Sequence, residues 1–322
     1  MPPPAWKVWT ALGLVYVFWG STYLAIRYVV ETLPPLLSAS LRFAVAGALL
    51  AIYLAARRGR SSFRATRQQL LGAASVGVLL LLGGNGLVTL AEQRELPSGL
   101  AALLIAAVPL WVVLLRVAGG DRPAPRTLLG VAIGFAGVAL LLLPGARPEG
   151  VPLLPAVLVV GAGALWSIGS YAATRLELPP DPLLTTVVQM VGGSVSLAAA
   201  GLLRGESPAP AEVSVTSVLA LAYLVVFGSL VAFTAYSWLL GVAPVSQVST
   251  YAYVNPVVAV LLGAVIAGEA VEAVTVLGGA VTVLAVAVVV SEEGRRRRST
   301  PLEVPADAPT VRSSGRDGSA AP

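Results

Sequence analysis

Three polar side chains, Gln247, Tyr251 and Asn255, follow one another at intervals of four residues in a long uncharged stretch. The period of an α-helix places all three on one face. Amide and aromatic groups can orient an amphipathic organic solute by hydrogen bonds and ring stacking, but they cannot neutralise several charges. The spacing therefore predicts a binding surface for a small organic compound.

Other apolar stretches carry similar polar or aromatic stripes. The stripes consist of Tyr16, Trp19 and Tyr23; of Asn85, Thr89 and Glu92; and of Trp166 and Ser170. Packing competes with binding as the explanation for each single residue, because polar side chains of membrane helices commonly hydrogen-bond a neighbouring helix. We predict that Trp19, Tyr23, Asn85 and Trp166 join the first set in binding a substrate.

Arg42 is a charged residue that lies well inside an apolar stretch. An arginine at the centre of a membrane helix costs about 3 kcal/mol on insertion scales, so it usually faces a helix bundle or water. Two roles stay open for it: attraction of a substrate carboxylate, or scaffolding through bonds to helix-end carbonyls. Glu92, near the end of its stretch, is the acid that could tip inward and carry a proton. Facilitated diffusion and exchange remain alternatives to proton antiport.

Most enzyme chemistry lacks its usual residues in this chain. The sequence contains no Cys and no His, which excludes disulfides, thiolate and imidazole metal ligands, and histidine-activated nucleophiles. It contains no Gly-Lys-Ser or Gly-Lys-Thr, and its one lysine is Lys7, so direct drive by an ATP-binding P-loop is excluded. We therefore predict no catalytic residues, no cofactor and no metal site.

Membrane helices are the elements that must position these residues. The chain is 57% hydrophobic and 11% charged, with a mean hydropathy of +0.84, whereas soluble domains carry about 25% charged residues. A bilayer-crossing helix needs about 20 mostly apolar residues. Such stretches are 8–26, 32–56, 68–91, 96–115, 127–146, 150–174, 182–203, 213–268 and 273–291, of which 213–268 is long enough for two crossings divided at 241–244. The sequence therefore predicts ten transmembrane helices.

The distribution of the arginines predicts the orientation of these helices in the membrane. Basic residues concentrate in the segments 57–67, 116–126 and 295–298, which alternate crossings place on one side. Because basic loops stay cytoplasmic, we predict cytoplasmic N- and C-termini in the cell (inner) membrane. The run 295–298 is interpreted as a lipid-facing anchor rather than a nucleic-acid site, and 292–322 as a disordered cytoplasmic tail.

The chain contains an internal repeat. When it is laid over itself so that Trp19 falls on Trp166, Pro35 falls on Pro182, Pro97 on Pro244 and Pro109 on Pro256. Each copy holds five crossings, an odd number, so the second copy must be inverted in the membrane. Residues 1–145 and 146–291 are therefore predicted to form two inverted five-helix repeats, an arrangement that favours alternating access.

The repeat adds two expectations about helices. Pro109 and Pro256 should bend their helices because proline removes a backbone hydrogen bond, and their matching positions predict a paired hinge or gate, with a simple kink as the alternative. The same alignment places Leu100, Leu104 and Val108 opposite the polar face of Gln247, Tyr251 and Asn255. We therefore expect an apolar cavity wall from the fourth helix.

A set of ordered motifs resembles EamA-type transporters of the drug/metabolite transporter superfamily. The motifs are Trp19-Gly20-Ser21-Thr22-Tyr23-Leu24-Ala25, Leu41-Arg42-Phe43, Pro97-Ser98-Gly99-Leu100-Ala101, Asn255-Pro256 and Gly268-Glu269. The resemblance covers about residues 8–291 and implies a carrier of small metabolites, amino acids or drug-like compounds with a central cavity. The chain departs from it at Gly119-Gly120-Asp121-Arg122, where the family often has Gly-Glu.

We therefore predict an all-α membrane protein that is an integral membrane transporter of small organic metabolites, amino-acid-like compounds or drugs, working by alternating access as an exporter. Its partners would be the lipid bilayer and a small-molecule substrate, with no nucleic acid. A homodimer stays open, with the glycine-rich helix 127–146 as a candidate contact. A carrier of phosphorylated or nucleotide sugars is the second candidate, and a membrane-embedded enzyme is the third.

Overall fold

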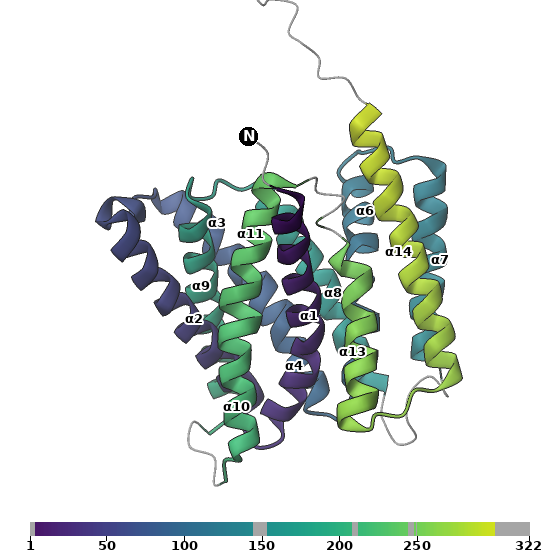
Figure 1. Ribbon diagram of the computed structural model, residues 1–322, viewed down its shortest axis with the longest axis horizontal. Coiled ribbons are helices and arrows are strands. Elements are labelled where there is room, and N and C mark those ends of the chain that lie inside the picture. The colour runs from purple at the N-terminus through teal and green to yellow at the C-terminus, as the bar shows by residue number, and fades with distance from the viewer. Residues whose placement is uncertain (1–3, 144–152, 208–211, 244–247, 249, 300–322) are drawn as a thin grey trace, which may run out of the picture.

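The computed structural model describes residues 4–143, 153–207, 212–243, 248 and 250–299. In these residues the chain is helical and contains no strand. The helices lie side by side along one direction, and the start of α1 lies at the same end of the bundle as the C-terminal end of α14 (Figure 1). The predicted all-α class is confirmed.

The first half of the chain makes five crossings. Three of them are single helices: α1 (Ala5–Val30), α2 (Pro35–Arg58) and α7 (Pro125–Leu142). The third crossing consists of α3 (Arg67–Gly77), the π-helical η2 (Val78–Gly86) and α4 (Leu87–Glu92). The fourth crossing consists of α5 (Ser98–Ile105) and α6 (Val108–Ala118). A short 3₁₀ turn, η1 (Arg60–Phe63), follows α2. Local signals begin several of these helices. Thr66 and Gln69 form a capping box at the start of α3, which satisfies two backbone groups reciprocally.

The second half repeats this order. Its elements are α8 (Leu153–Ala173); α9 (Pro182–Leu203); an eighth crossing of α10 (Val215–Tyr223), the π-helical η3 (Leu224–Val231) and α11 (Ala232–Val242); α13 (Tyr251–Ala267); and α14 (Ala273–Ser299). Among the described residues, nine helices are long and apolar enough to cross a bilayer, and α13 is a shorter apolar helix of 17 residues. The prediction of ten crossings is confirmed.

Corresponding helices of the two halves run in opposite directions. Glu206, beyond the C-terminal end of α9, accepts hydrogen bonds from the backbone N–H groups of Leu36 and Leu37 at the start of α2. At the other end of the same pair of helices, Arg58 forms an ion pair with Asp181 over 2.7 Å. Because α2 and α9 occupy equivalent places in the two halves, their antiparallel packing shows that the halves are inverted.

The helices α7 and α14 show the same antiparallel relation. A Cβ atom on Gly130 would lie 2.8 Å from Val289, and one on Gly137 would lie 2.5 Å from the Thr282 hydroxyl. Glycine is therefore required for this close approach of two membrane helices. The glycine face of α7 is covered by α14 of the same chain, so these glycines are not exposed to a second copy.

The two π-helical segments were not predicted from the sequence. In the repeat alignment Val78, which begins η2, falls on Val225, the second residue of η3. Each segment widens its helix by an i→i+5 hydrogen-bond pattern, which frequently marks a functional site. The pair shows that the two halves share a backbone irregularity, because it occurs at the same depth of the third and eighth crossings.

The two prolines predicted as a paired hinge differ in their surroundings. The fourth crossing is interrupted between α5 and α6, directly before Pro109, as expected for a residue without a backbone N–H. Pro256 lies inside α13, which continues through it. The helix break at Pro109 is thus present, whereas the hinge role of both prolines stays a prediction.

The disordered tail was predicted to start too early in the sequence. The last helix, α14, extends to Ser299, so residues 292–299 are helical rather than disordered. Glutamate and arginine are good helix formers even where no membrane surrounds them, and Arg295 lies 3.4 Å from Glu292 one turn earlier. Residues 300–322 of that prediction lie outside the described part of the chain.

Candidate functional site

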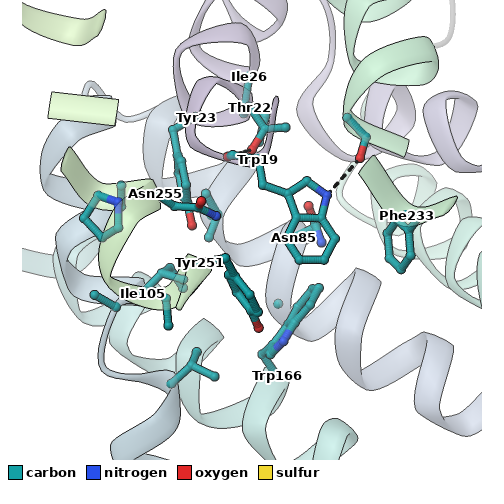
Figure 2. A pocket seen from close by; sticks show the side chains of 18 of the residues that line it. Trp19, Thr22, Tyr23, Ile26, Asn85, Ile105, Trp166, Phe233, Tyr251 and Asn255 are labelled. Carbon is teal, nitrogen blue, oxygen red and sulfur yellow. Dashed lines mark hydrogen bonds between the residues drawn. The ribbon is translucent and has the colours of Figure 1, made fainter. Parts of the chain in front are cut away.

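A cavity of about 120 Å³ lies between the two halves of the bundle, with space for on the order of ten water molecules. It brings together residues from seven of the crossings: the first to the fourth, the sixth, the eighth and the ninth. The residues singled out from the sequence that line it are Trp19, Tyr23, Arg42, Asn85, Trp166, Tyr251, Asn255 and Pro256. Figure 2 shows Trp19, Trp166 and Tyr251 projecting into the space between the helices. Gln247, the remaining predicted binding residue, lies outside the described residues.

Aromatic rings surround Trp19 on one side of the cavity. The ring centroid of Trp19 lies 5.5 Å from that of Phe233, 5.0 Å from that of Tyr236 and 5.2 Å from that of Tyr251. Its indole Nε1 donates a hydrogen bond of 3.2 Å to the carbonyl oxygen of Gly228 in η3 (Figure 2). Packing and hydrogen bonding thus fix the ring, which provides a rigid apolar surface for a ligand.

Arg42 contributes the positive charge of the cavity. It comes from α2, and only 5% of its surface is exposed. Its Nε donates a hydrogen bond of 3.0 Å to the Ser229 hydroxyl, and its guanidinium lies 4.8 Å from the centroid of the Phe43 ring. Within the described part of the chain, no carboxylate pairs with this guanidinium and its terminal nitrogens have no hydrogen-bond partner. A buried cation without a counter-ion is therefore available to a ligand.

Asn255 contributes an acceptor to the same cavity. The residue is 7% exposed, and its Oδ1 is buried without a hydrogen-bond partner among the described residues. An unpaired buried carbonyl costs about 1–3 kcal/mol. Because buried polar groups are usually paired, this oxygen is a candidate partner for an N–H or O–H group of a ligand.

The apolar wall of the cavity differs from the one we expected. Leu100 and Leu104 are only 3% and 1% exposed and pack in the hydrophobic core, so they do not line the cavity. Val108, the third residue expected in this wall, does line the cavity, and Ala102, Ile105 and Ala106 of the same crossing line it as well. We had assumed that α5 and α13, as equivalent helices, turn equivalent faces toward the cavity. The face of α5 that lines the cavity is not the one that the alignment with α13 indicates.

Three of the predicted polar residues form hydrogen bonds within the protein and do not line the cavity. Thr89 donates to the carbonyl oxygen of Asn85, and Ser170 donates to that of Trp166, each over 2.8 Å. Tyr16 forms a hydrogen bond with Thr250. None of these three stripe members is among the residues that line the cavity. Tyr16 bonds a distant segment, as the packing explanation expects, whereas Thr89 and Ser170 bond within their own helices.

Glu92 and Pro109 do not line the cavity either. Glu92 ends α4 with 4% of its surface exposed, and neither carboxylate oxygen has a hydrogen-bond partner among the described residues. Pro109 follows Val108, whose side chain does line the cavity. The proton-carrying role predicted for Glu92 remains a proposal.

The sequence did not reveal the glycines that shape this cavity. A Cβ atom on Gly84 in η2 would lie 2.6 Å from the ring of Trp166, and one on Gly228 in η3 would lie 3.0 Å from a terminal nitrogen of Arg42. Glycine therefore leaves the space that the two large side chains fill. For Gly84, the sequence did contain one indication, the pair Gly83-Gly84 directly before the polar Asn85.

A second cluster, also missed, joins three crossings near the end of the bundle where α1 ends. Glu269 follows Gly268, whose φ of 63° ends α13, and its side chain is 5% exposed. It pairs with Arg27 of α1 and accepts the backbone N–H groups of Ser98 and Gly99 at the start of α5. The motif Gly268-Glu269 was visible in the sequence, but its partners are more than 150 residues away.

Known proteins share this architecture. A solved crystal structure aligns with a TM-score of 0.62 at 22% identity, covering 91% of this chain and 100% of that chain, which shows the same fold. The uncharacterized inner membrane transporter YedA of Escherichia coli K12 is 38% identical over 279 residues, which cover 87% of this chain and 89% of that protein. A probable amino-acid metabolite efflux pump of Salmonella typhimurium is 25% identical over 280 residues, covering 84% and 90%.

The sequence profile of the EamA-like transporter family matches the chain twice, over residues 7–143 and 153–291. Each match contains five of the crossings described above. The chain therefore belongs to the EamA-like transporter family, and it is a membrane transporter.

Proposed function

We propose that this transporter carries a small amphipathic organic solute with one carboxylate, such as an amino acid or a related metabolite, out of the cell. The observation that carries the proposal is the guanidinium of Arg42, buried in the cavity with no acidic partner in the described residues. A carboxylate is the group that matches a guanidinium best, because two parallel N–H···O bonds can form.

The other walls of the cavity fit the remaining parts of such a solute. Asn255 Oδ1 offers an acceptor for an ammonium or amide N–H, and the faces of Trp19 and Tyr251 favour a cation or an aromatic ring. Ile105 and Val108 provide an apolar surface for a side chain. The name of the Salmonella typhimurium relative, a probable amino-acid metabolite efflux pump, supports the same class.

Phosphorylated and nucleotide sugars fit this cavity less well. A phosphate carries about two negative charges, and a diphosphate carries more, whereas Arg42 is the one basic residue among the described residues that line the cavity. The amide and aromatic groups cannot neutralise the remaining charge. A singly charged solute is therefore preferred over the second candidate class.

Alternating access is the mechanism that the inverted halves support. Two inverted repeats around one central site give two nearly equivalent arrangements, each open to one side. We place the boundary between the repeats at 145/146. The basic segments lie at the end of the bundle where α1 starts and α14 ends, so we assign this end, and both termini, to the cytoplasm.

A binding experiment with matched ligands tests this proposal. The purified protein in lipid nanodiscs is heated with leucine, phenylalanine or tryptophan and with their carboxamides, because a ligand of the folded state raises the apparent melting temperature. We expect stabilisation by the amino acids that exceeds that of the carboxamides. Arg42→Gln should weaken amino-acid binding by at least about 30-fold, the equivalent of about 2 kcal/mol for a lost buried charge pair.

Arg94→Gln is the matched control. It also removes one positive charge, but Arg94 lies outside the cavity, in the turn after α4, and donates to the carbonyl oxygen of Leu90 in that helix. This variant should bind like the wild type. Equal binding of amino acids and carboxamides by the wild type, or unchanged binding by a monodisperse Arg42→Gln protein, would contradict the proposal.

A further inference from the structure

The cluster around Glu269 joins three helices near the end of the bundle where α1 ends. Its carboxylate accepts the N–H groups of Ser98 over 2.9 Å and Gly99 over 3.1 Å at the start of α5, and it pairs with Arg27 near the end of α1. Since Glu269 itself directly follows α13, the three crossings α1, α5 and α13 are held together at this end. In the orientation proposed above this is the outer end.

Glu92 lies beside this cluster without sharing in its hydrogen bonds. It is 96% buried, since 4% of its surface is exposed, and both of its carboxylate oxygens are buried without a partner among the described residues. The helix that it ends, α4, packs against α1, which carries Arg27, and against α5, whose first backbone N–H groups donate to Glu269. The hydroxyl oxygen of Ser98, next to Glu269, is also buried and unpartnered. The cluster thus contains three buried oxygen atoms that no group of the described chain satisfies.

The charges of the cluster do not balance. Two carboxylates, Glu92 and Glu269, face a single guanidinium, that of Arg27. An unpaired charge in a buried site is expensive, and two like charges close together disfavour each other. With Glu269 engaged by Arg27 and by two backbone N–H groups, Glu92 is the group for which a neutral, protonated form balances the site.

Other ionisable groups near Glu92 do not supply the missing positive charge. The elements packed against α4 are η2, α1, α2, α5 and α8. Of these, α1 contributes the phenol of Tyr23 and the guanidinium of Arg27. From α2, Arg42 lies beside Asn85 and Thr89, which precede Glu92 by seven and three residues, and it donates a hydrogen bond to Ser229. A mobile cation from solvent, of which the proton is the smallest, can therefore complete the site.

We propose that Glu92 is a proton-binding site that controls the outer gate of the carrier. In the closed arrangement Glu92 holds a proton, and Arg27 pairs with Glu269. When the O–H bond of Glu92 breaks and its proton leaves to water, the new carboxylate competes with Glu269 for Arg27. The contact of α1 with α5 and α13 is thereby weakened, so the cavity opens to the outer side. Proton uptake reverses these steps, and no electron is transferred. The inference rests on the proposed alternating-access function for its role in transport.

The test follows the opening of the gate directly and needs no substrate. Since the chain contains no cysteine, the substitution Thr22→Cys places a single thiol in the wall of the cavity. The protein is reconstituted in liposomes, and a membrane-impermeant maleimide is added on the outer side between about pH 6 and about pH 9. The same cysteine is placed in Glu92→Gln, and the ratio of the two labelling rates at each pH removes the intrinsic pH dependence of the thiol.

We expect this ratio to rise with pH, by up to about tenfold per pH unit where Glu92 releases its proton. Glu92→Gln cannot lose a proton, so its outer gate should stay closed at every pH. Arg27→Gln should label rapidly at every pH, because the ion pair between Arg27 and Glu269 is absent. Glu92→Asp should keep a pH response. Glu95→Gln is the matched control, because Glu95 is an exposed acid three residues further along, and it should behave like the protein with Glu92.

A ratio that does not change with pH would overturn the inference, as would a pH response in Arg27→Gln equal to that of the parent protein. The comparison of Arg27→Gln with the parent protein does not use Glu92→Gln, so it tests the inference even where Glu92→Gln fails to fold. Labelling reports the gate and not the ligand, so a pH-dependent gate in a protein that binds no amino acid would refute the proposed substrate alone. Amino-acid binding with a pH-independent gate would refute the proton site alone.

Discussion

Replacing Ser229 by alanine removes the hydrogen bond that the described structure gives to Arg42. Arg42 Nε donates to Ser229 Oγ over 3.0 Å, and the two residues are 5% and 0% exposed. Interhelical hydrogen bonds between membrane helices are worth about 0.6 kcal/mol on average and about 1.7 kcal/mol at most. A charged donor roughly doubles the strength of a hydrogen bond. We therefore expect this bond to stabilise the fold by about 1.2 kcal/mol.

A double-mutant cycle measures that contribution. The free energy of unfolding is obtained by titration with sodium dodecyl sulfate, followed by circular dichroism, for the wild type, Ser229→Ala, Arg42→Met and the double variant. Methionine keeps the length of the arginine side chain without its donors. The coupling energy should be about 1.2 kcal/mol, and substrate affinity in Ser229→Ala should fall by at most about eightfold, the same energy expressed as a binding ratio.

The control cycle pairs Arg42→Met with Ser196→Ala. Ser196 donates to the carbonyl oxygen of Gly193 in its own helix α9, so the two changes should be additive. Independent sites add within about 0.3–0.5 kcal/mol. A coupling of Arg42 with Ser229 below about 0.5 kcal/mol would therefore refute the view that this serine holds the guanidinium in place.

Three further changes are expected to separate packing from binding. Gly137→Ala should lower the unfolding free energy because its Cβ would meet a hydroxyl of α14 at 2.5 Å, whereas Gly161→Ala, with no atom within 4 Å, should raise it by about 0.5–1 kcal/mol; the reverse order in detergent titration would contradict the helix contact. Leu100→Ala should cost about 2–5 kcal/mol of stability, while Ile105→Ala should chiefly change ligand affinity; equal effects on affinity would restore the apolar wall first expected. Glu206→Ala should destabilise the protein by about 1 kcal/mol, as the loss of a helix cap does, and unchanged stability would contradict its role at the start of α2.

The fold was largely predictable from the distribution of apolar residues. A membrane helix satisfies all of its backbone hydrogen bonds internally, so each long apolar stretch specifies one element without knowledge of its neighbours. The odd number of crossings per repeat then determined the inversion, which the contacts of α2 with α9 confirm. The helical extension to Ser299 was missed because polar composition alone does not distinguish an exposed helix from a disordered tail.

The irregular backbone was less predictable. The break before Pro109 follows from the chemistry of proline, but η2 and η3 carry no comparable residue, and apolar sequences of the same kind form regular helix elsewhere in the chain. A π-helical segment depends on tertiary packing as well as on local sequence. The faces that the third and eighth crossings present to the cavity could therefore not be derived from helical periodicity.

The cavity residues were predictable where a polar or aromatic group is costly in hydrocarbon. Trp19, Asn85 and Asn255 were recognised for that reason, and they do line one cavity. Leu100 was assigned wrongly because an apolar residue is equally stable facing a cavity, a helix or lipid. Glu269 was missed because its partners, Arg27 and the start of α5, come together only in the folded chain.

The two ends of the bundle differ more than an inverted repeat requires, and the difference favours one conformation. In the repeat, Gly120-Asp121 corresponds to Gly268-Glu269, and both glycines have positive φ. Asp121, however, is 54% exposed and pairs with Arg116 of its own crossing, an interaction worth about 0–1 kcal/mol. Glu269 is 5% exposed and joins three crossings. In the proposed alternating-access cycle, identical ends would make the two arrangements equally stable, so we expect the end at Glu269 to be the closed one.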